Sequence, residues 1–224
     1  MSLLYTVSKL TAGTVLRLGW RPTVEGREHV PASGGAIFAG NHLSVADELF
    51  LAIAVPRHIA FWAKAEYFSG GGLRGRVTRA VVRGVGAIPV ERGGGRAVLS
   101  AFDAAVPVLR GGGLVTVYPE GTRSPDGRLY RGRSVVARLA LAAGVPVIPV
   151  GMIGTDAIQP IGARVPRPGP VTVRFGKPMD FTDRASDYSG LRAITDEVMA
   201  EIQKLTDQEY VPQYAPAKRA PTAG

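Results

Sequence analysis

The stretch GAIFAGNHLSVADELFLAIAV, residues 35–55, combines the two patterns from which this fold is built. Its first half is a short apolar run that ends in turn residues, which is typical of a buried strand. Its second half has apolar residues at helical spacing, with Ser44 as a candidate N-cap. The segment therefore predicts a strand that leads directly into a helix, with His42 and Asp47 at the junction.

The same alternation continues along the chain. Further apolar runs are HIAFWAK (58–64), GAIPVER (86–92), GLVTVYPEG (113–121), VPVIPVGMIG (145–154) and VTVRFGKPM (171–179). Helical patterns are LRGRVTRAVVRGV (73–85), RAVLSAFDAAVPVLRGG (96–112), SVVARLALAAG (134–144) and LRAITDEVMAEIQKLTDQ (191–208). Strands that alternate with helices predict an α/β fold, with a mixed or mostly parallel sheet covered by helices. In such sheets, functional residues gather where strands end and helices begin.

A length of 224 residues favours one domain with short appendages. We expect an N-terminal interfacial helix over 1–22, an α/β domain over 23–209 and a flexible Pro/Ala-rich tail over 210–224. The first segment has an apolar side with basic and aromatic residues beside it, so it either packs on its own domain or lies at a membrane surface. The basic composition favours the membrane surface.

No segment reads as a signal peptide or a membrane span. Lys9 stands where a signal peptide would have its apolar core. The longest uncharged apolar stretch, Leu139–Thr155, is shorter than the roughly 20 residues that a span needs, and it contains two prolines. We therefore expect a peripheral or monotopic protein on the cytoplasmic face of the cell membrane.

The charged residues are 27 Lys and Arg against 18 Asp and Glu, a formal net charge of +9. This balance favours anionic partners: nucleic acid, anionic lipid headgroups or phosphorylated substrates. Cysteine is absent, which excludes disulfides, thiolate metal sites and cysteine nucleophiles. With only three scattered histidines, we expect no metal site.

His42 and Asp47 form the candidate catalytic pair. An imidazole held by a carboxylate through one nitrogen leaves the other nitrogen free to act as a general base. Asp47 also has a purely structural interpretation, because SVAD (44–47) has the shape of a capping box in which Asp47 reaches back to the Ser44 amide. The two interpretations are compatible. Neither of the other histidines has an aspartate five residues downstream.

A serine nucleophile to complete a triad is missing. GRSVVA around Ser134 lacks the closing glycine of a nucleophile elbow. The pair must therefore activate a nucleophile carried by the substrate, and an alcohol is the natural candidate.

Two segments that follow predicted strands are candidate phosphate sites. Arg92 comes directly after one strand, and Glu120, Gly121, Thr122 and Arg123 come directly after another. Glycines let backbone amides approach an anion, and arginine grips phosphate bidentately. Alone, either segment is more often an ordinary strand-to-helix turn with a solvated arginine, and Glu120 has an alternative interpretation as a structural carboxylate that holds a neighbouring backbone group or arginine. Their combination with His42 favours a phosphate site, which Lys64 in the aromatic strand WAKAEYF can reach.

These residues resemble the glycerolipid acyltransferase family, specifically the bacterial 1-acyl-glycerol-3-phosphate acyltransferases. Four blocks occur in the order of that family: NHLSVAD (41–47), GAIPVER (86–92), PEGTRS (119–124) and VPVIPV (145–150). The resemblance implies transfer of an acyl chain from acyl-CoA or acyl-carrier protein to the sn-2 hydroxyl of lysophosphatidic acid, which gives phosphatidic acid for phospholipid synthesis. It implies no cofactor or metal ion, and an anionic membrane surface as the place of action.

The resemblance also implies roles for individual residues. His42 would deprotonate the acceptor hydroxyl, which attacks the thioester without a covalent acyl-enzyme, and Asp47 would orient His42. The acceptor phosphate would bind Arg92, Arg123 and the backbone around Gly121, with Lys64 assisting, Thr122 in the same turn and Glu120 supporting it. The fourth block, with Pro149, would serve either the acyl-donor side or the core.

One departure from the family pattern bears on the acceptor. After the third block, relatives have an aromatic residue followed by Lys-x-Gly, whereas here Arg131 and Arg133 flank Gly132. Arginine keeps the charge but changes the geometry, so another lysolipid acceptor is the alternative substrate. A nucleic-acid-binding module or a non-catalytic membrane scaffold would explain the charge but not the His–Asp pair, and we expect no nucleic acid partner.

Overall fold

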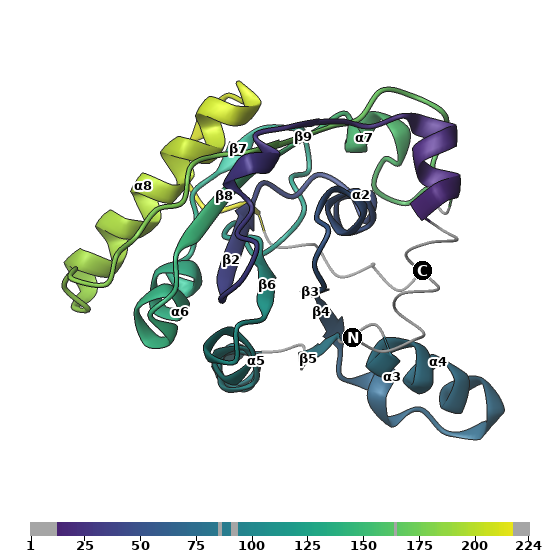
Figure 1. The fold of residues 1–224 in the computed structure, drawn as a ribbon, viewed down its shortest axis with the longest axis horizontal. Helices are drawn as coiled ribbons and strands as arrows, with labels where there is room; N and C mark the ends of the chain where they lie inside the picture. Colours follow the sequence, from purple (N-terminus) through teal and green to yellow (C-terminus); the bar gives the residue numbers. More distant parts are fainter. Residues whose placement is uncertain (1–12, 85–86, 91–93, 164, 217–224) are drawn as a thin grey trace.

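The structure of the chain, a computed structural model, describes residues 13–84, 87–90, 94–163 and 165–216. A twisted sheet of six strands runs through the middle of the molecule, with helices on both faces (Figure 1). Its strand order is β1-β9-β8-β2-β6-β3. The bounds are β1 Thr23–Glu25, β2 Ala36–Gly40, β3 Ile59–Ala60, β6 Leu114–Val117, β8 Val147–Ile153 and β9 Thr172–Phe175. All neighbours are parallel except β8 and β9. The predicted α/β fold with a mostly parallel sheet is confirmed.

Central strand β2 is buried along its whole length, as its uninterrupted apolar sequence predicts. On one face of the sheet lie α5 (Gly94–Arg110), α6 (Val135–Ala143) and α8 (Tyr188–Thr206), whose buried residues form one core cluster with Ile37 and Val115. On the other face α2 (Ala46–Ala54) packs Phe50 and Leu51 against Phe38. Figure 1 shows these two layers on opposite sides of the sheet.

The remaining elements lie around this body. They are the 3-10 turn η1 (Arg27–His29), β4 (Trp62–Lys64), α3 (Glu66–Ser69), α4 (Gly72–Gly84), β5 (Ile88–Val90), β7 (Leu129–Tyr130), α7 (Thr155–Ile158) and β10 (Tyr210–Val211). Strands β4 and β5 form a parallel pair, and β10 forms another with β7. The second pair lies in the segment expected to be a flexible tail from residue 210, and it joins Tyr210 and Val211 to β7; residues 217–224 lie outside the described residues.

The described part of the N-terminal segment is helical over residues 13–20. Leu16 and Trp20 pack on the core cluster that contains α2, and the Trp20 indole donates to the Arg167 carbonyl at 2.7 Å. Val15 and Leu18 point outward and are 64% and 72% exposed. In the described part of the chain, no helix has the length and apolar character needed to cross a membrane.

Candidate active site

His42 and Asp47 meet directly after the carboxyl end of β2. His42 Nδ1 lies 2.7 Å from Asp47 Oδ2, with the Asp47 side chain fully buried and the His42 side chain 16% exposed. Among the described residues no hydrogen-bond partner is recorded for Nε2 of His42. The buried carboxylate thus engages one ring nitrogen and leaves the other without a partner among the described residues, which is the arrangement that a general base needs.

Asp47 Oδ2 also holds the backbone of the turn. It accepts from the amides of Leu43 at 2.8 Å and Ser44 at 2.9 Å. The Ser44 hydroxyl accepts from Ala46 N at 3.2 Å and donates to the Gln159 carbonyl at 2.7 Å. The catalytic and the capping interpretation of Asp47 therefore both apply to Oδ2, because this one atom binds the imidazole and also holds the backbone at the start of the helix.

The loop after β6 is tied to His42 by two hydrogen bonds. Ser124 N donates to the His42 carbonyl at 2.7 Å, and His42 N donates to Glu120 Oε1 at 3.2 Å. Parallel strands β2 and β6 are neighbours, so their carboxyl ends bring these loops to one edge of the sheet. The first and third sequence blocks therefore form one site.

Glu120 is a buried carboxylate, 1% exposed, whose second oxygen accepts from Tyr130 N at 2.9 Å. Burial raises its pKa from 4.5 to about 7, although the two backbone amides act in the opposite direction. Both oxygens are engaged by main-chain donors. The structural interpretation of Glu120 fits this geometry, because the carboxylate links the His42 loop to β7.

Gly121, Thr122 and Arg123 form the turn that faces α2. Gly121 has φ 76°, a left-handed conformation that favours glycine, and its amide donates to the Tyr118 carbonyl at 2.9 Å. Arg123 is half-buried and makes no hydrogen bond or ion pair with any described residue. Burial and then the charge of Asp47 raise the pKa of Glu48 to about 7, while the charge of Arg123 opposes the rise. Arg123 is thus a cation close to the start of α2 that is available to bind a ligand.

Tyr118 is a neighbour of His42 that the sequence did not reveal. The two rings are stacked, with centroids 3.9 Å apart and an interplanar angle of 12°. The Tyr118 hydroxyl is buried and has no hydrogen-bond partner, and burial raises the pKa of this phenol well above 10. The Tyr118 ring therefore restricts the imidazole to one plane, and the Tyr118 hydroxyl makes no hydrogen bond to it.

Two predicted phosphate ligands are not placed by the structure. Arg92 lies outside the described residues. Lys64 ends β4 and pairs with Val90 of β5, so its backbone lies beside the strand that leads to Arg92, but its side chain is not described. Within the described ranges, His, Asp and Glu side chains form no group of three that could hold a metal ion.

The acyltransferase family model matches residues 21–153, more than half of the chain and all four sequence blocks. The chain belongs to the acyltransferase family. Among relatives of this acyltransferase, a chloroplastic 1-acyl-sn-glycerol-3-phosphate acyltransferase of Arabidopsis thaliana is 27% identical over 77% of the chain and 48% of that protein. The 1-acyl-sn-glycerol-3-phosphate acyltransferase of Borreliella burgdorferi is 29% identical over 62% of the chain and 53% of that protein. The chain thus spans about half the length of these curated relatives.

The acyltransferase fold also matches a solved structure. The crystal structure of the 1-acyl-sn-glycerophosphate acyltransferase PlsC from Thermotoga maritima superposes with a TM-score of 0.70. The two sequences are 29% identical, and the match covers 91% of this chain and 79% of that one. The likeness therefore extends over the sheet and both helical layers.

The fourth block and Asn41 belong to the frame of the acyltransferase site. Pro149 lies in β8, buried and opposite Ala39 of β2, which places it in the core of the sheet. Asn41, fully buried, donates to the Met152 carbonyl at 2.9 Å and accepts from Met152 N at 2.7 Å. This side chain continues the β2–β8 pairing beyond the end of β2 and so fixes the start of the His42 turn.

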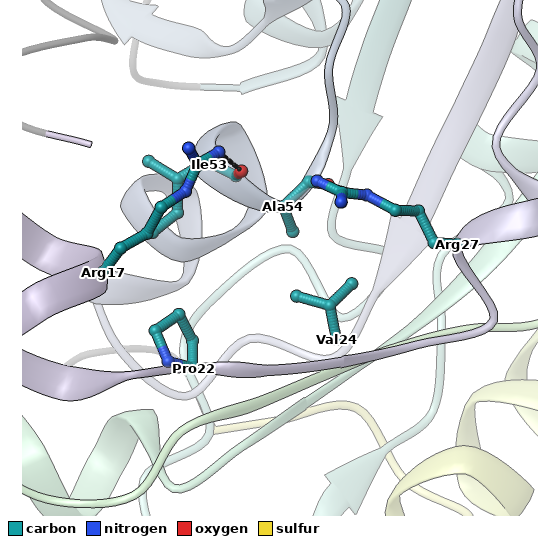
Figure 2. Close-up of a pocket in the computed structure, with 6 residues that line it drawn as sticks. All are labelled: Arg17, Pro22, Val24, Arg27, Ile53 and Ala54. Carbon is teal, nitrogen blue, oxygen red and sulfur yellow. Dashed lines mark hydrogen bonds between the residues drawn. The ribbon is translucent and has the colours of Figure 1, made fainter. Parts of the chain in front are cut away.

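A hollow at the opposite end of α2 is unrelated to His42. Figure 2 shows its lining by Arg17, Pro22, Val24, Arg27, Ile53 and Ala54. Arg17 donates to the Ile53 carbonyl at 2.8 Å, and Arg27 donates to the Ala54 carbonyl at 3.0 Å. These arginines satisfy carbonyls at the end of the helix, where cations are favourable. Arg17, in the segment expected to be an interfacial helix, is thus engaged in packing of the domain.

Proposed function

We propose that the protein transfers a fatty acyl chain from acyl-CoA or acyl-carrier protein to the free sn-2 hydroxyl of lysophosphatidic acid, which gives phosphatidic acid. The observation that carries the proposal is the His42–Asp47 pair at 2.7 Å, in which the second ring nitrogen of a partly exposed histidine has no partner among the described residues. The relatives' names, 1-acyl-sn-glycerol-3-phosphate acyltransferase and 1-acyl-sn-glycerophosphate acyltransferase, support the same acceptor.

In the proposed reaction, His42 Nε2 accepts the proton of the acceptor hydroxyl as its oxygen attacks the thioester carbonyl. Asp47 holds the proton on Nδ1 and stabilises the positive charge that develops on the ring. The tetrahedral intermediate collapses with cleavage of the C–S bond, and the imidazolium returns its proton to the leaving thiolate. No enzyme nucleophile takes part, because the substrate alcohol performs that role.

The acceptor phosphate is proposed to bind at the turn of Gly121, Thr122 and Arg123, with Arg92 and Lys64 as further ligands. Arg123, in the described part of the chain, has no ion-pair partner there and is available to bind the phosphate. The turn is connected to His42 by the hydrogen bond from Ser124 N to the His42 carbonyl. This link fixes the distance between the phosphate and the base. Glu120 supports the site from within, since both of its oxygens are bound to backbone amides.

Action at the surface of a membrane is the last part of the proposal. The exposed Val15 and Leu18 side chains of helix 13–20 and the net charge of +9 suit an anionic bilayer surface. We place the protein at the cytoplasmic face, where acyl thioesters are made.

The deciding experiment is acyl transfer from palmitoyl-CoA to 1-acyl-glycerol-3-phosphate by purified protein in detergent. His42→Ala should abolish transfer while binding to anionic vesicles persists. His29→Ala is the matched control, because the His29 ring contacts the Phe175 carbonyl and lies away from the proposed site. Acyl transfer that survives in His42→Ala would refute the mechanism. If folded wild type transfers no acyl chain from either acyl-CoA or acyl-carrier protein, lysophosphatidic acid is not the acceptor.

A further inference from the structure

Arg131 and Arg133 converge on the ring of Tyr214. The guanidinium carbon of Arg131 lies 5.5 Å from the ring centroid and that of Arg133 lies 4.9 Å from it. The two arginines flank Gly132 in the extended segment after β7, so their side chains project to the same side. Tyr214 comes from the C-terminal segment that follows β10.

The backbone of this segment is held at each residue. Arg131 N donates to the carbonyls of Val211 at 3.1 Å and Gln213 at 3.0 Å, and Arg133 N donates to the Pro119 carbonyl at 2.7 Å. The Gly132 carbonyl accepts from Arg192 at 2.7 Å. A Cβ at Gly132 would lie 2.8 Å from Met199 Sδ, so the segment lies tightly against α8. The positions of the two guanidiniums are therefore built into the fold.

Neither guanidinium is neutralised. Within the described ranges, four other arginines pair with carboxylates: Arg128 with Asp126, Arg174 with Glu25, Arg184 with Glu197 and Arg192 with Asp196. Arg131 and Arg133 have no such partner there. Both guanidiniums lie against the same ring without a neutralising carboxylate among the described residues, and a bound anion would offset this concentration of positive charge.

The cluster borders the turn of the third block. Arg133 Nε lies 3.1 Å from the position that a Cβ on Gly121 would take. Gly121 begins the turn that carries Arg123, and the same loop donates from Ser124 N to the His42 carbonyl. Arg133 thus lies beside the turn that carries Arg123, and the Ser124 amide at the end of that turn binds the His42 carbonyl.

We propose that Arg131 and Arg133, braced by Tyr214, bind the phosphomonoester of the acceptor together with Arg123. The proposal rests on the proposed function and assigns recognition of the acceptor phosphate to these arginines. The short glycerol backbone requires the acceptor phosphate to bind close to His42, whereas the phosphates of coenzyme A lie at the far end of the pantetheine arm. Guanidinium pairs bind the three terminal oxygens of a monoester dianion bidentately, and a phosphodiester offers fewer oxygens and less charge.

The test compares Arg131→Gln/Arg133→Gln with Arg184→Gln/Lys204→Gln, which removes the same charge from exposed ion pairs elsewhere. We expect the acceptor KM of the first variant to rise about tenfold or more, with the palmitoyl-CoA KM unchanged. Arg133→Lys should restore part of the loss. Transfer to monoacylglycerol, which lacks the phosphate, should be equal in both variants.

A second measurement does not depend on turnover. Glycerol 3-phosphate should raise the unfolding temperature of wild type and of the control variant but not of Arg131→Gln/Arg133→Gln. A wild type that transfers no acyl chain would refute the proposed function, and this thermal shift would still test the anion site. If only the palmitoyl-CoA KM rises, the cluster binds the donor. If both KM values and the thermal shift stay as in wild type, the cluster only packs the C-terminal segment against the domain. Either result overturns the proposal.

Discussion

Replacement of Asp47 by asparagine separates the two roles of this side chain. Asp47 Oδ2 accepts three hydrogen bonds, from His42 Nδ1, Leu43 N and Ser44 N, and Oδ1 is buried without a partner. An asparagine can place its oxygen at the Oδ2 position and its amide nitrogen at the Oδ1 position. The turn and the orientation of the ring should survive, and the negative charge beside the imidazole is lost.

The structure gives the size of each effect. Loss of the charge removes the stabilisation of the imidazolium, so we expect kcat to fall by about 10²–10⁴ with little change in the acceptor KM. The free energy of unfolding should fall by about 1–3 kcal/mol, because one buried amide nitrogen lacks an acceptor. Asp47→Ala leaves three donors unpaired and should cost about 3–6 kcal/mol, which is a large share of the stability of a typical domain.

The assay is steady-state transfer to 1-acyl-glycerol-3-phosphate, with urea unfolding of both variants followed by circular dichroism. Asp47→Asn should be folded and slow, and Asp47→Ala should be largely unfolded or poorly stable. A folded Asp47→Asn protein with kcat within a few-fold of wild type would refute the role of the charge. Equal destabilisation by both substitutions would show that asparagine cannot replace the hydrogen bonds.

Substitutions at three further positions test the frame around His42. The native pKa of Glu120, about 7 against 4.5 in the unfolded chain, means that the folded protein binds the proton more tightly. The free energy of unfolding should therefore fall by up to about 3 kcal/mol between pH 4.5 and 7 and then level off, and Glu120→Gln should reduce this slope in urea titrations; an unchanged slope contradicts the assignment. Asn41→Ala leaves both backbone groups of Met152 unpaired and should cost about 2–5 kcal/mol, measured by urea unfolding. Tyr118→Phe should keep kcat and gain up to about 1 kcal/mol, because the buried hydroxyl has no partner, whereas Tyr118→Leu should lower kcat through loss of the stacked ring; equal kcat values would dismiss the stacking.

The sequence predicted the long and strongly patterned elements and missed several of the short ones. Strand β2 and helix α2 follow from an apolar run and a helical period within residues 35–55. Strands β1, β7 and β10 have two or three residues each, too few to show a period. Their existence depends on partners distant in the chain, as β1 pairs with β9 and β10 with β7.

The C-terminal segment 210–216 makes contacts that its composition does not show. Enrichment in proline and alanine indicates a segment that cannot form a core of its own. It does not show which contacts the rest of the fold makes with that segment. Val211 and Gln213 accept from Arg131 N, and Tyr214 lies against two arginines. These contacts supply order that no local pattern shows.

The residues of the candidate site also fall into two groups, those that the sequence predicts and those that only the fold brings together. His42 and Asp47 were predictable because the turn that joins them is local. Glu120 was recognised as a candidate, but its two backbone partners come from separate loops, and only the fold brings them together. Tyr118 gives no sequence signal, because stacking on His42 depends on the alignment of β6 with β2.

Two buried carboxylates hold His42 from different sides, so the contacts that stabilise the fold here are also those that would position the proposed base. Glu120 binds the His42 amide and fixes where the residue lies, and Asp47 binds the ring and fixes how it is turned. Each carboxylate also closes a backbone connection, to Tyr130 in one case and to Leu43 and Ser44 in the other. Removal of either one therefore loosens the chain at the point where it positions the base. The informative substitutions at this site are those that keep the shape and change only the charge, because a loss of activity then has one cause.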